Sequence, residues 1–275
     1  VSIAPRSALS PPRAVVRRAA PVSSARQRLD LLASLGMDAT LLMPFTLELA
    51  SVSAEEFCRA VLKEALHTHV LFIGYDFCLG RDQAGPEAIS NIGRRLGFEV
   101  MHIHAVMFEG SPVSSTRIRR ALADGRLDLA NAMLGRPHTV RGMVVHGAGR
   151  GGPLLGVPTA NLEQTGVMLP RPAVYATTAR LTDGGKAMPS VTCFSRNPTF
   201  RTGRPEEDAL TLETHILDFS GDIYGRELEV AFMGRLREAQ KFRGPDELVA
   251  QLHADIEARR GMGEHFSPLS DTALY

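Results

Sequence analysis

The rhythm of apolar segments changes once along the chain, at Gly135-Arg136-Pro137, and this change constrains the fold more than any other feature. Before it, stretches with helical spacing alternate with short apolar runs typical of buried strands. After it, from Thr139 to Met233, short β-prone segments follow one another across Gly- and Pro-containing turns. The first rhythm predicts a parallel sheet covered by helices, and the second predicts a closed antiparallel barrel. A chain of 275 residues is long enough for two such domains.

The N-terminal half carries recognisable start and stop signals for its elements. Ser53 and Glu56 form a capping-box pattern that opens a helix, and Gly36 ends an earlier one that begins near residue 26. A further helix is expected near 86–96, and strands are expected at 41–43, 69–73 and 98–106. Gly74, Asp76 and Phe77 follow the second strand, at the carboxyl end where parallel sheets bind ligands.

The C-terminal half divides into evenly spaced strands and one helix. Strands are expected at 140–145, 174–181, 190–194, 210–217 and 227–233, and an amphipathic helix at 245–260. We therefore predict an N-terminal α/β domain over 1–135, a barrel domain with a C-terminal helix over 136–262, and a tail over 263–275.

Composition narrows the class of protein. The net charge is +1 and no apolar run reaches the ~20 residues that a bilayer span needs, so neither nucleic-acid nor membrane partners are expected. The three cysteines form no CxxC pair, which argues against zinc and against a disulfide framework. The acid-free, arginine-rich first 29 residues resemble a transit peptide in composition, but a truncated or unusual domain start is the preferred interpretation. We expect a cytoplasmic protein with small-molecule partners, and the oligomeric state stays open.

A glycine-rich segment follows the first barrel strand and formally contains GxGxxG. It runs through Gly147, Gly149, Arg150 and Gly151, but Pro153 follows at once and no helix begins there. The segment therefore lacks the strand–turn–helix context of a dinucleotide site. Two interpretations remain, a plain barrel turn or a flexible loop whose backbone N–H groups approach an anion.

Thr159 and Asn161 form a second candidate site about ten residues further on. In an extended segment, residues i and i+2 point to the same face. A hydroxyl and an amide oxygen on one face suit Mg²⁺, which takes its remaining ligands from water and phosphates. The alternative interpretation is a surface turn with a polar tip.

Several segments in order resemble the bacterial bifunctional riboflavin kinase/FAD synthetase family. The kinase-like segments are 144–151, 155–162, 197–200, 212–219, 222–228 and 235–237. The adenylyltransferase-like segments are 74–80 and 114–119. The resemblance covers about residues 12–260. It implies an α/β nucleotidyltransferase (Rossmann-like) domain, incomplete at its N-terminus, followed by an antiparallel six-stranded riboflavin-kinase-type barrel.

The resemblance also implies a reaction and roles for individual residues. The barrel domain would transfer the γ-phosphate of ATP to riboflavin, giving FMN, with Glu213 as general base. Thr159 and Asn161 would hold Mg²⁺ and phosphate. The remaining implied residues are Gly147, Gly149, Arg150 and Gly151 for ATP, Asn197, Thr199 and Arg235 for flavin, and Gly74, Asp76, Phe77, Ser115, Thr116 and Arg119 as an adenylyltransferase remnant. Without the resemblance, Glu213 reads as an outward-facing residue of an alternating strand.

Three departures from the family pattern limit the expected activity. The sequence has no His-x-Gly-His loop, and Pro112 stands where the family usually has an arginine. Segment 193–196 reads Cys-Phe-Ser-Arg where the family usually has Asn-Ile-Gly. We expect a riboflavin kinase whose adenylyl transfer to FMN is lost or crippled, and whose N-terminal half exposes strand edges and apolar surface. The alternatives are a fragment of the full bifunctional enzyme and a non-catalytic flavin- or nucleotide-binding remnant.

Overall fold

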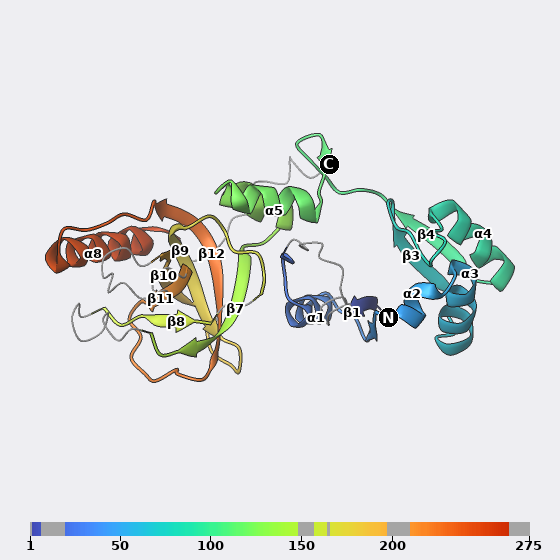
Figure 1. The fold of residues 1–275 in the computed structure, drawn as a ribbon, viewed down its shortest axis with the longest axis horizontal. Helices are drawn as coiled ribbons and strands as arrows, with labels where there is room; N and C mark the ends of the chain where they lie inside the picture. The colour runs from blue at the N-terminus through green and yellow to red at the C-terminus, as the bar shows by residue number, and fades with distance from the viewer. Residues whose placement is uncertain (1, 7–19, 148–156, 164–165, 197–209, 264–275) are drawn as a thin grey trace. The chain divides into compact units, whose positions relative to one another are not determined.

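The computed structural model describes residues 2–6, 20–147, 157–163, 166–196 and 210–263 (Figure 1). Within them the chain forms two compact units, which are treated separately. The first contains residues 2–6 and 25–113, and the second contains residues 20–24 and 114–263. Across the described residues, every helix is too short or too polar to cross a membrane.

The first unit alternates helices and short strands, as its sequence pattern predicts. Its helical elements are α1 (Ala25–Ser34), α2 (Leu47–Ser51), α3 (Ala54–Phe57), the π-helical η1 (Cys58–Ala65) and α4 (Pro86–Leu96). Its strands are β1 (Ser2–Arg6), β2 (Thr40–Pro44), β3 (Val70–Gly74), β4 (Glu99–Ile103), β5 (Met107–Phe108) and β6 (Ser111–Pro112). The capping box at Ser53 and Glu56 is confirmed.

The parallel strands of the first unit form two separate pairs, β1–β2 and β3–β4. One face of β3–β4 packs on the cluster built by α3, η1 and α4, through Leu71 and Val100. The opposite face is open, with Phe72 60% and Ile103 50% exposed. Exposed apolar surface was expected in this half, whereas strand β1 was not, because its residues show no strand-like alternation.

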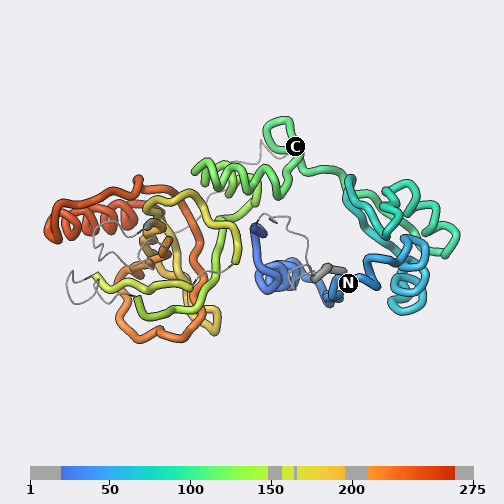
Figure 2. Tube along the Cα trace, in the orientation of Figure 1, coloured from blue at the N-terminus to red at the C-terminus, as the bar shows by residue number. Residues whose placement is uncertain are grey.

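The second unit is a closed barrel with flanking helices, and the expected six-stranded antiparallel architecture is confirmed (Figure 1). Neighbouring strands follow the order β10-β11-β8-β7-β12-β9. Figure 2 shows the course of the chain as a tube, coloured by residue number. The strands are β7 (His138–Val145), β8 (Ala160–Leu162), β9 (Ala173–Leu181), β10 (Met188–Arg196), β11 (Leu210–Ile216) and β12 (Glu227–Arg237). The helices are α5 (Ser115–Ala123), α6 (Leu127–Leu134) and α8 (Pro245–Gly261).

Alternation along β11 separates the barrel interior from its outer face. Leu212, Thr214 and Ile216 are buried inside the barrel, and the residues between them are half-buried on the outside. Four fully buried hydroxyls join across the interior by hydrogen bonds of 2.7–2.9 Å, those of Thr177, Ser190, Thr192 and Thr214. These bonds satisfy polar groups that would otherwise destabilise an apolar core.

Helix α8 covers part of the outer face, beside β9 and β10, where Ile256 packs against Val174 and Val191. An ion pair holds the helix to the end of β12: Arg237 Nη2 lies 2.8 Å from Asp255 Oδ2 and Arg237 Nε lies 2.9 Å from Oδ1. Asp255 is only 4% exposed, so the pair is largely removed from water. The outer face next to the ladder of β10 and β11 is thereby bordered by a fixed helix.

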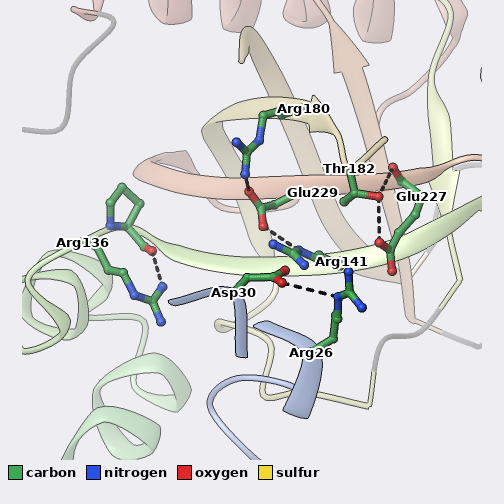
Figure 3. A network of polar contacts seen from close by, with 9 residues as sticks. Arg26, Asp30, Arg136, Arg141, Arg180, Thr182, Glu227 and Glu229 are labelled. Atoms are coloured by element: carbon green, nitrogen blue, oxygen red, sulfur yellow. Dashed lines mark hydrogen bonds and ion pairs between the residues drawn. The ribbon is translucent and has the colours of Figure 1, made fainter. Parts of the chain in front are cut away.

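A second set of ion pairs crosses three strands on another part of the outer face (Figure 3). Glu229 of β12 accepts hydrogen bonds from Arg141 of β7 at 2.6 Å and from Arg180 of β9 at 2.7 Å. Both arginines are the register partners of Glu229. The three side chains therefore reinforce the pairing of β7, β12 and β9.

Candidate active site

The site develops along one row of residues on the outer face of the barrel. In the antiparallel ladders, Glu213 of β11 lies directly opposite Asn161 of β8 on one side and Cys193 of β10 on the other. Directly opposed residues of an antiparallel pair point to the same face. The Glu213 carboxylate and the Asn161 amide are far apart in the sequence. They are nevertheless neighbours on one surface, outside the barrel core.

Glu213 is a carboxyl group held in a water-poor environment. Its carboxylate accepts a long hydrogen bond from the Thr211 hydroxyl, which lies 3.4 Å from Oε1. None of the ion pairs formed among the described residues includes Glu213. Burial raises the pKa of the Glu213 carboxyl above its ordinary value, and the Thr211 hydroxyl opposes this only in part. A carboxylate with a raised pKa is suited to accept a proton from an alcohol.

The amide of Asn161 rests against Gly147, at the point where β7 has ended. A Cβ atom at position 147 would lie 2.2 Å from Asn161 Nδ2 and 2.5 Å from its Cγ. Non-bonded atoms do not approach each other so closely, so the amide of Asn161 occupies the space that a side chain at position 147 would fill. Because Gly147 has no side chain, the Asn161 amide can lie against its backbone.

Thr159 stands one residue before β8 and is half-buried, as Asn161 is. The residue ahead of it, Pro158, is tied to β11: His215 Nδ1 lies 2.7 Å from the Pro158 carbonyl oxygen. The segment with Thr159 and Asn161 is thus held from two sides, by His215 on β11 and by Gly147 after β7. It is the restrained start of β8, with a hydroxyl and an amide two residues apart.

An aromatic stack marks the entry to the glycine-rich segment. The ring of His146 lies 3.8 Å from that of Tyr224, centroid to centroid, with 27° between the planes. Backbone hydrogen bonds join Val144 to Gly225 and Arg226, the two residues that follow Tyr224, and hold the same two stretches together. Gly149, Arg150 and Gly151, which complete the predicted ATP loop, lie outside the described residues.

Mg²⁺ binds hard oxygen ligands in an octahedral arrangement. Within the described ranges no group of three or more His, Cys, Asp or Glu could hold a metal ion. Thr159 and Asn161 supply hard oxygen donors, and the room left by Gly147 accommodates the amide. Two protein oxygens suit Mg²⁺ when phosphates and water complete the octahedron, so these residues fit that ion as a partner of ATP.

The predicted flavin residues divide into two groups. Asn197 and Thr199 lie outside the described residues. Arg235 is on β12, where its guanidinium pairs with Glu238, and that carboxylate raises the pKa of Arg235. Arg235 is opposite Tyr175 in the ladder, whereas Arg237 is opposite Val174, the register partner of Cys193. Arg237, rather than Arg235, is therefore in the same row as Glu213.

The predicted adenylyltransferase residues fall in both compact units. Gly74 ends β3, and Asp76 and Phe77 follow in an exposed turn of the first unit. Ser115, Thr116 and Arg119 are on α5 in the second unit, which Ser114 caps through its side chain. Arg119 is half-buried, and its Nε has no hydrogen-bond partner among the described residues.

Sequence reasoning gave no role to His215, Tyr224 or Arg237. For His215 a signal existed: it stands two residues after Glu213 on a predicted strand and so shares its face. The stack of Tyr224 on His146 and the pairing of Arg237 with Asp255 have no such signal, since both join segments that only the fold brings together.

Comparisons with known proteins identify the family of each region of the chain. The model of the riboflavin kinase family matches residues 134–262, and that of the FAD synthetase family matches residues 4–117. The first matched region contains the barrel, and the second covers most of the described first unit.

Curated relatives carry both regions in one chain. A bifunctional riboflavin kinase/FMN adenylyltransferase of Pseudomonas fluorescens is 36% identical over 228 residues, which cover 82% of this chain and 71% of that protein. The Escherichia coli K12 protein of the same description is 34% identical over 240 residues, covering 86% and 74%.

A solved structure from Streptococcus pneumoniae, described as a macrolide-efflux protein, superimposes with a TM-score of 0.75 at 32% identity, covering 88% of this chain and 76% of that one. That description concerns the pneumococcal protein. The two family models and the curated relatives together show that this chain belongs to the family of bifunctional riboflavin kinases/FMN adenylyltransferases.

Proposed function

We propose that the barrel region, residues 136–262, phosphorylates the ribityl 5′-hydroxyl of riboflavin with ATP, with Glu213 as the general base. The observation that carries the proposal is the register of β11 and β8, which puts Glu213 directly beside Asn161 on one face. Phosphoryl transfer needs an acceptor for the alcohol proton close to the site that holds the triphosphate. The raised pKa of the Glu213 carboxyl supports this role.

Thr159 and Asn161 would hold Mg²⁺, which when bound neutralises charge on the transferred phosphate. The amide of Asn161 is oriented by Gly147, and the Thr159 segment by its neighbours on β11. The predicted loop residues Gly149, Arg150 and Gly151 would cover ATP, and Asn197, Thr199 and Arg235 would contact flavin. In this arrangement the protein supplies position and one proton acceptor, which is what a phosphoryl transfer requires of it.

We further propose that these 275 residues by themselves form FAD slowly. Pro112 stands where the family usually has an arginine, and a cationic phosphate clamp contributes several powers of ten to such a rate. The described parallel strands of the first unit form two separate pairs, and one face of β3–β4 is exposed. The FAD synthetase match over residues 4–117 favours the alternative, an active second centre.

Product analysis with riboflavin, ATP and Mg²⁺ separates these functions. We expect FMN to accumulate and FAD to stay a minor product. Rapid FAD formation from FMN would contradict the proposed loss of adenylyl transfer and favour the full bifunctional activity.

A Glu213→Gln variant tests the kinase assignment. It should lower kcat for FMN formation by about 10²- to 10⁴-fold, because the alcohol proton loses its acceptor. The matched control is Glu257→Gln, which changes an exposed carboxylate on α8 and should leave kcat unchanged. Binding of riboflavin to Glu213→Gln, followed by flavin fluorescence, should persist. A wild-type protein that binds flavin and forms no FMN would instead favour the non-catalytic remnant.

A further inference from the structure

The side chain of His215 continues a strand pairing that the backbone does not. The ladder between β8 and β11 ends at the pair Ala160–Thr214. One residue further along β11, His215 Nδ1 lies 2.7 Å from the Pro158 carbonyl oxygen, 57 positions earlier in the chain. This distance is at the short end of the range for N–H···O hydrogen bonds.

Pro158 depends on such a partner more than another residue would. A proline has no backbone N–H, so its carbonyl is its only main-chain hydrogen-bonding group. The carbonyl also sets the plane of the peptide bond that leads into Thr159, because the atoms of that bond are coplanar. A bond to this oxygen therefore restrains the backbone immediately before the Thr159 hydroxyl.

We infer that His215 is a positioning residue, whose Nδ1–H holds the Pro158–Thr159 peptide so that Thr159 and Asn161 present their oxygens together. The inference deepens the proposed kinase function and rests on it for the role of those two residues. Gly147 orients the Asn161 amide from the side of β7, and His215 fixes the Thr159 end from the side of β11. The two contacts act on opposite ends of the same four-residue segment.

The protonation pattern of the imidazole follows from its partner. A carbonyl oxygen only accepts, so Nδ1 must carry a hydrogen. In the neutral ring Nε2 is then unprotonated, whereas in the cation both nitrogens carry hydrogens and the Nδ1 bond persists. The contact is therefore a structural tether made through the Nδ1 hydrogen.

Replacing His215 can distinguish a role of its hydrogen bond from a role of its side-chain volume. Asparagine carries its N–H₂ group one bond from Cγ, as histidine carries Nδ1, whereas glutamine carries it one bond further out. We expect His215→Asn to keep the KM for Mg-ATP within about twofold of wild type. His215→Ala and His215→Gln should raise it by about three- to tenfold, more than kcat falls, since one hydrogen bond is lost. His253→Ala, at an exposed histidine of α8, is the matched control.

Two readouts do not depend on catalysis. Hydrogen exchange of the amides of Thr159 and Ala160 should accelerate in the Ala and Gln variants and stay near wild type in the Asn variant. In the wild-type protein, ¹⁵N NMR of the His215 ring should show the Nδ1–H tautomer in the neutral state. An Nε2–H tautomer, or equal exchange rates and equal KM values in the Asn, Gln and Ala variants, would overturn the inference.

The His215 variants and the two non-catalytic readouts also separate this inference from the proposed kinase function. If the wild-type protein makes no FMN, the proposed kinase function fails, and the tautomer and exchange rates still decide whether the tether exists. If FMN is made and the three variants behave alike, the kinase function stands and the positioning role of His215 falls. Variants that do not fold leave the tautomer of the wild-type ring as the deciding measurement.

Discussion

A single methyl group added at Gly147 should disable the site while leaving the fold intact. A Cβ there would meet Asn161 Nδ2 at 2.2 Å and Oδ1 at 2.8 Å. The contacted atoms form the end of a side chain, so the amide can rotate away without moving a strand. The backbone at 147 is outside the left-handed region, which means that alanine itself introduces no backbone strain.

The size of the effect follows from the displacement. Restoring an ordinary contact of 3.4 Å requires the Asn161 nitrogen to move by about 1.2 Å. A misplacement of about 1 Å in a positioning group costs on the order of 100-fold in rate, or about 2.7 kcal/mol of transition-state stabilisation. The free energy of unfolding should change by less than about 1 kcal/mol, since the rotation is local and Gly→Ala also lowers the entropy of the unfolded chain.

The assay pairs kcat/KM for Mg-ATP with urea unfolding of Gly147→Ala. Gly261→Ala is the control, because no atom lies within 4 Å of the added methyl group and its φ is not positive. In an Asn161→Ala background the Gly147→Ala change should cost less than about threefold, because the displaced amide is gone. A Gly147→Ala protein with kcat/KM within threefold of wild type would refute the reasoning, as would an equal loss in the Asn161→Ala background.

The remaining predictions concern stability. Burial lowers the pKa of His138 to about 4, from 6.5 in the unfolded chain, so the unfolded state binds more protons between these values. The protein should therefore lose about 3 kcal/mol as the pH falls from 6.5 to 4, and His138→Gln should remove this part of the slope in urea titrations. Asp255→Ala should cost about 3 kcal/mol, because Arg237 is left without its largely buried partner; a loss below about 1 kcal/mol in urea unfolding would contradict this. Thr192→Val should cost about 1–3 kcal/mol by orphaning buried hydroxyls, and calorimetry showing a raised Tm would be the contrary result.

The barrel was largely predictable from local pattern. The expected strands at 140–145, 174–181 and 190–194 lie inside β7, β9 and β10, and the helix expected over 245–260 is α8. Period-2 alternation and turn residues are short-range signals, so they mark each strand without knowledge of its partner. The neighbours of a strand are a different matter, and the order β10-β11-β8-β7-β12-β9 appears only in the structure.

The first unit was predicted element by element but not as a sheet. The capping box at Ser53 and the helix at α4 are as expected, while β1 was missed because Ser2–Arg6 has no apolar alternation. The strands pair two by two, and the apolar face of β3–β4 remains open. Pairing depends on contacts between segments remote in sequence, for which a single sequence carries little signal.

For the site, the sequence by itself determined which chemical groups are available: a carboxylate at 213, a hydroxyl at 159, an amide at 161 and a glycine at 147. Tertiary structure alone decided which of them are neighbours. Strand register brings Glu213 opposite Asn161, and contacts across 14 and 57 positions fit Gly147 to Asn161 and His215 to Pro158. The physical reason is that residue type sets what a group can bind or accept, whereas closure of the barrel sets the distances at which those groups act.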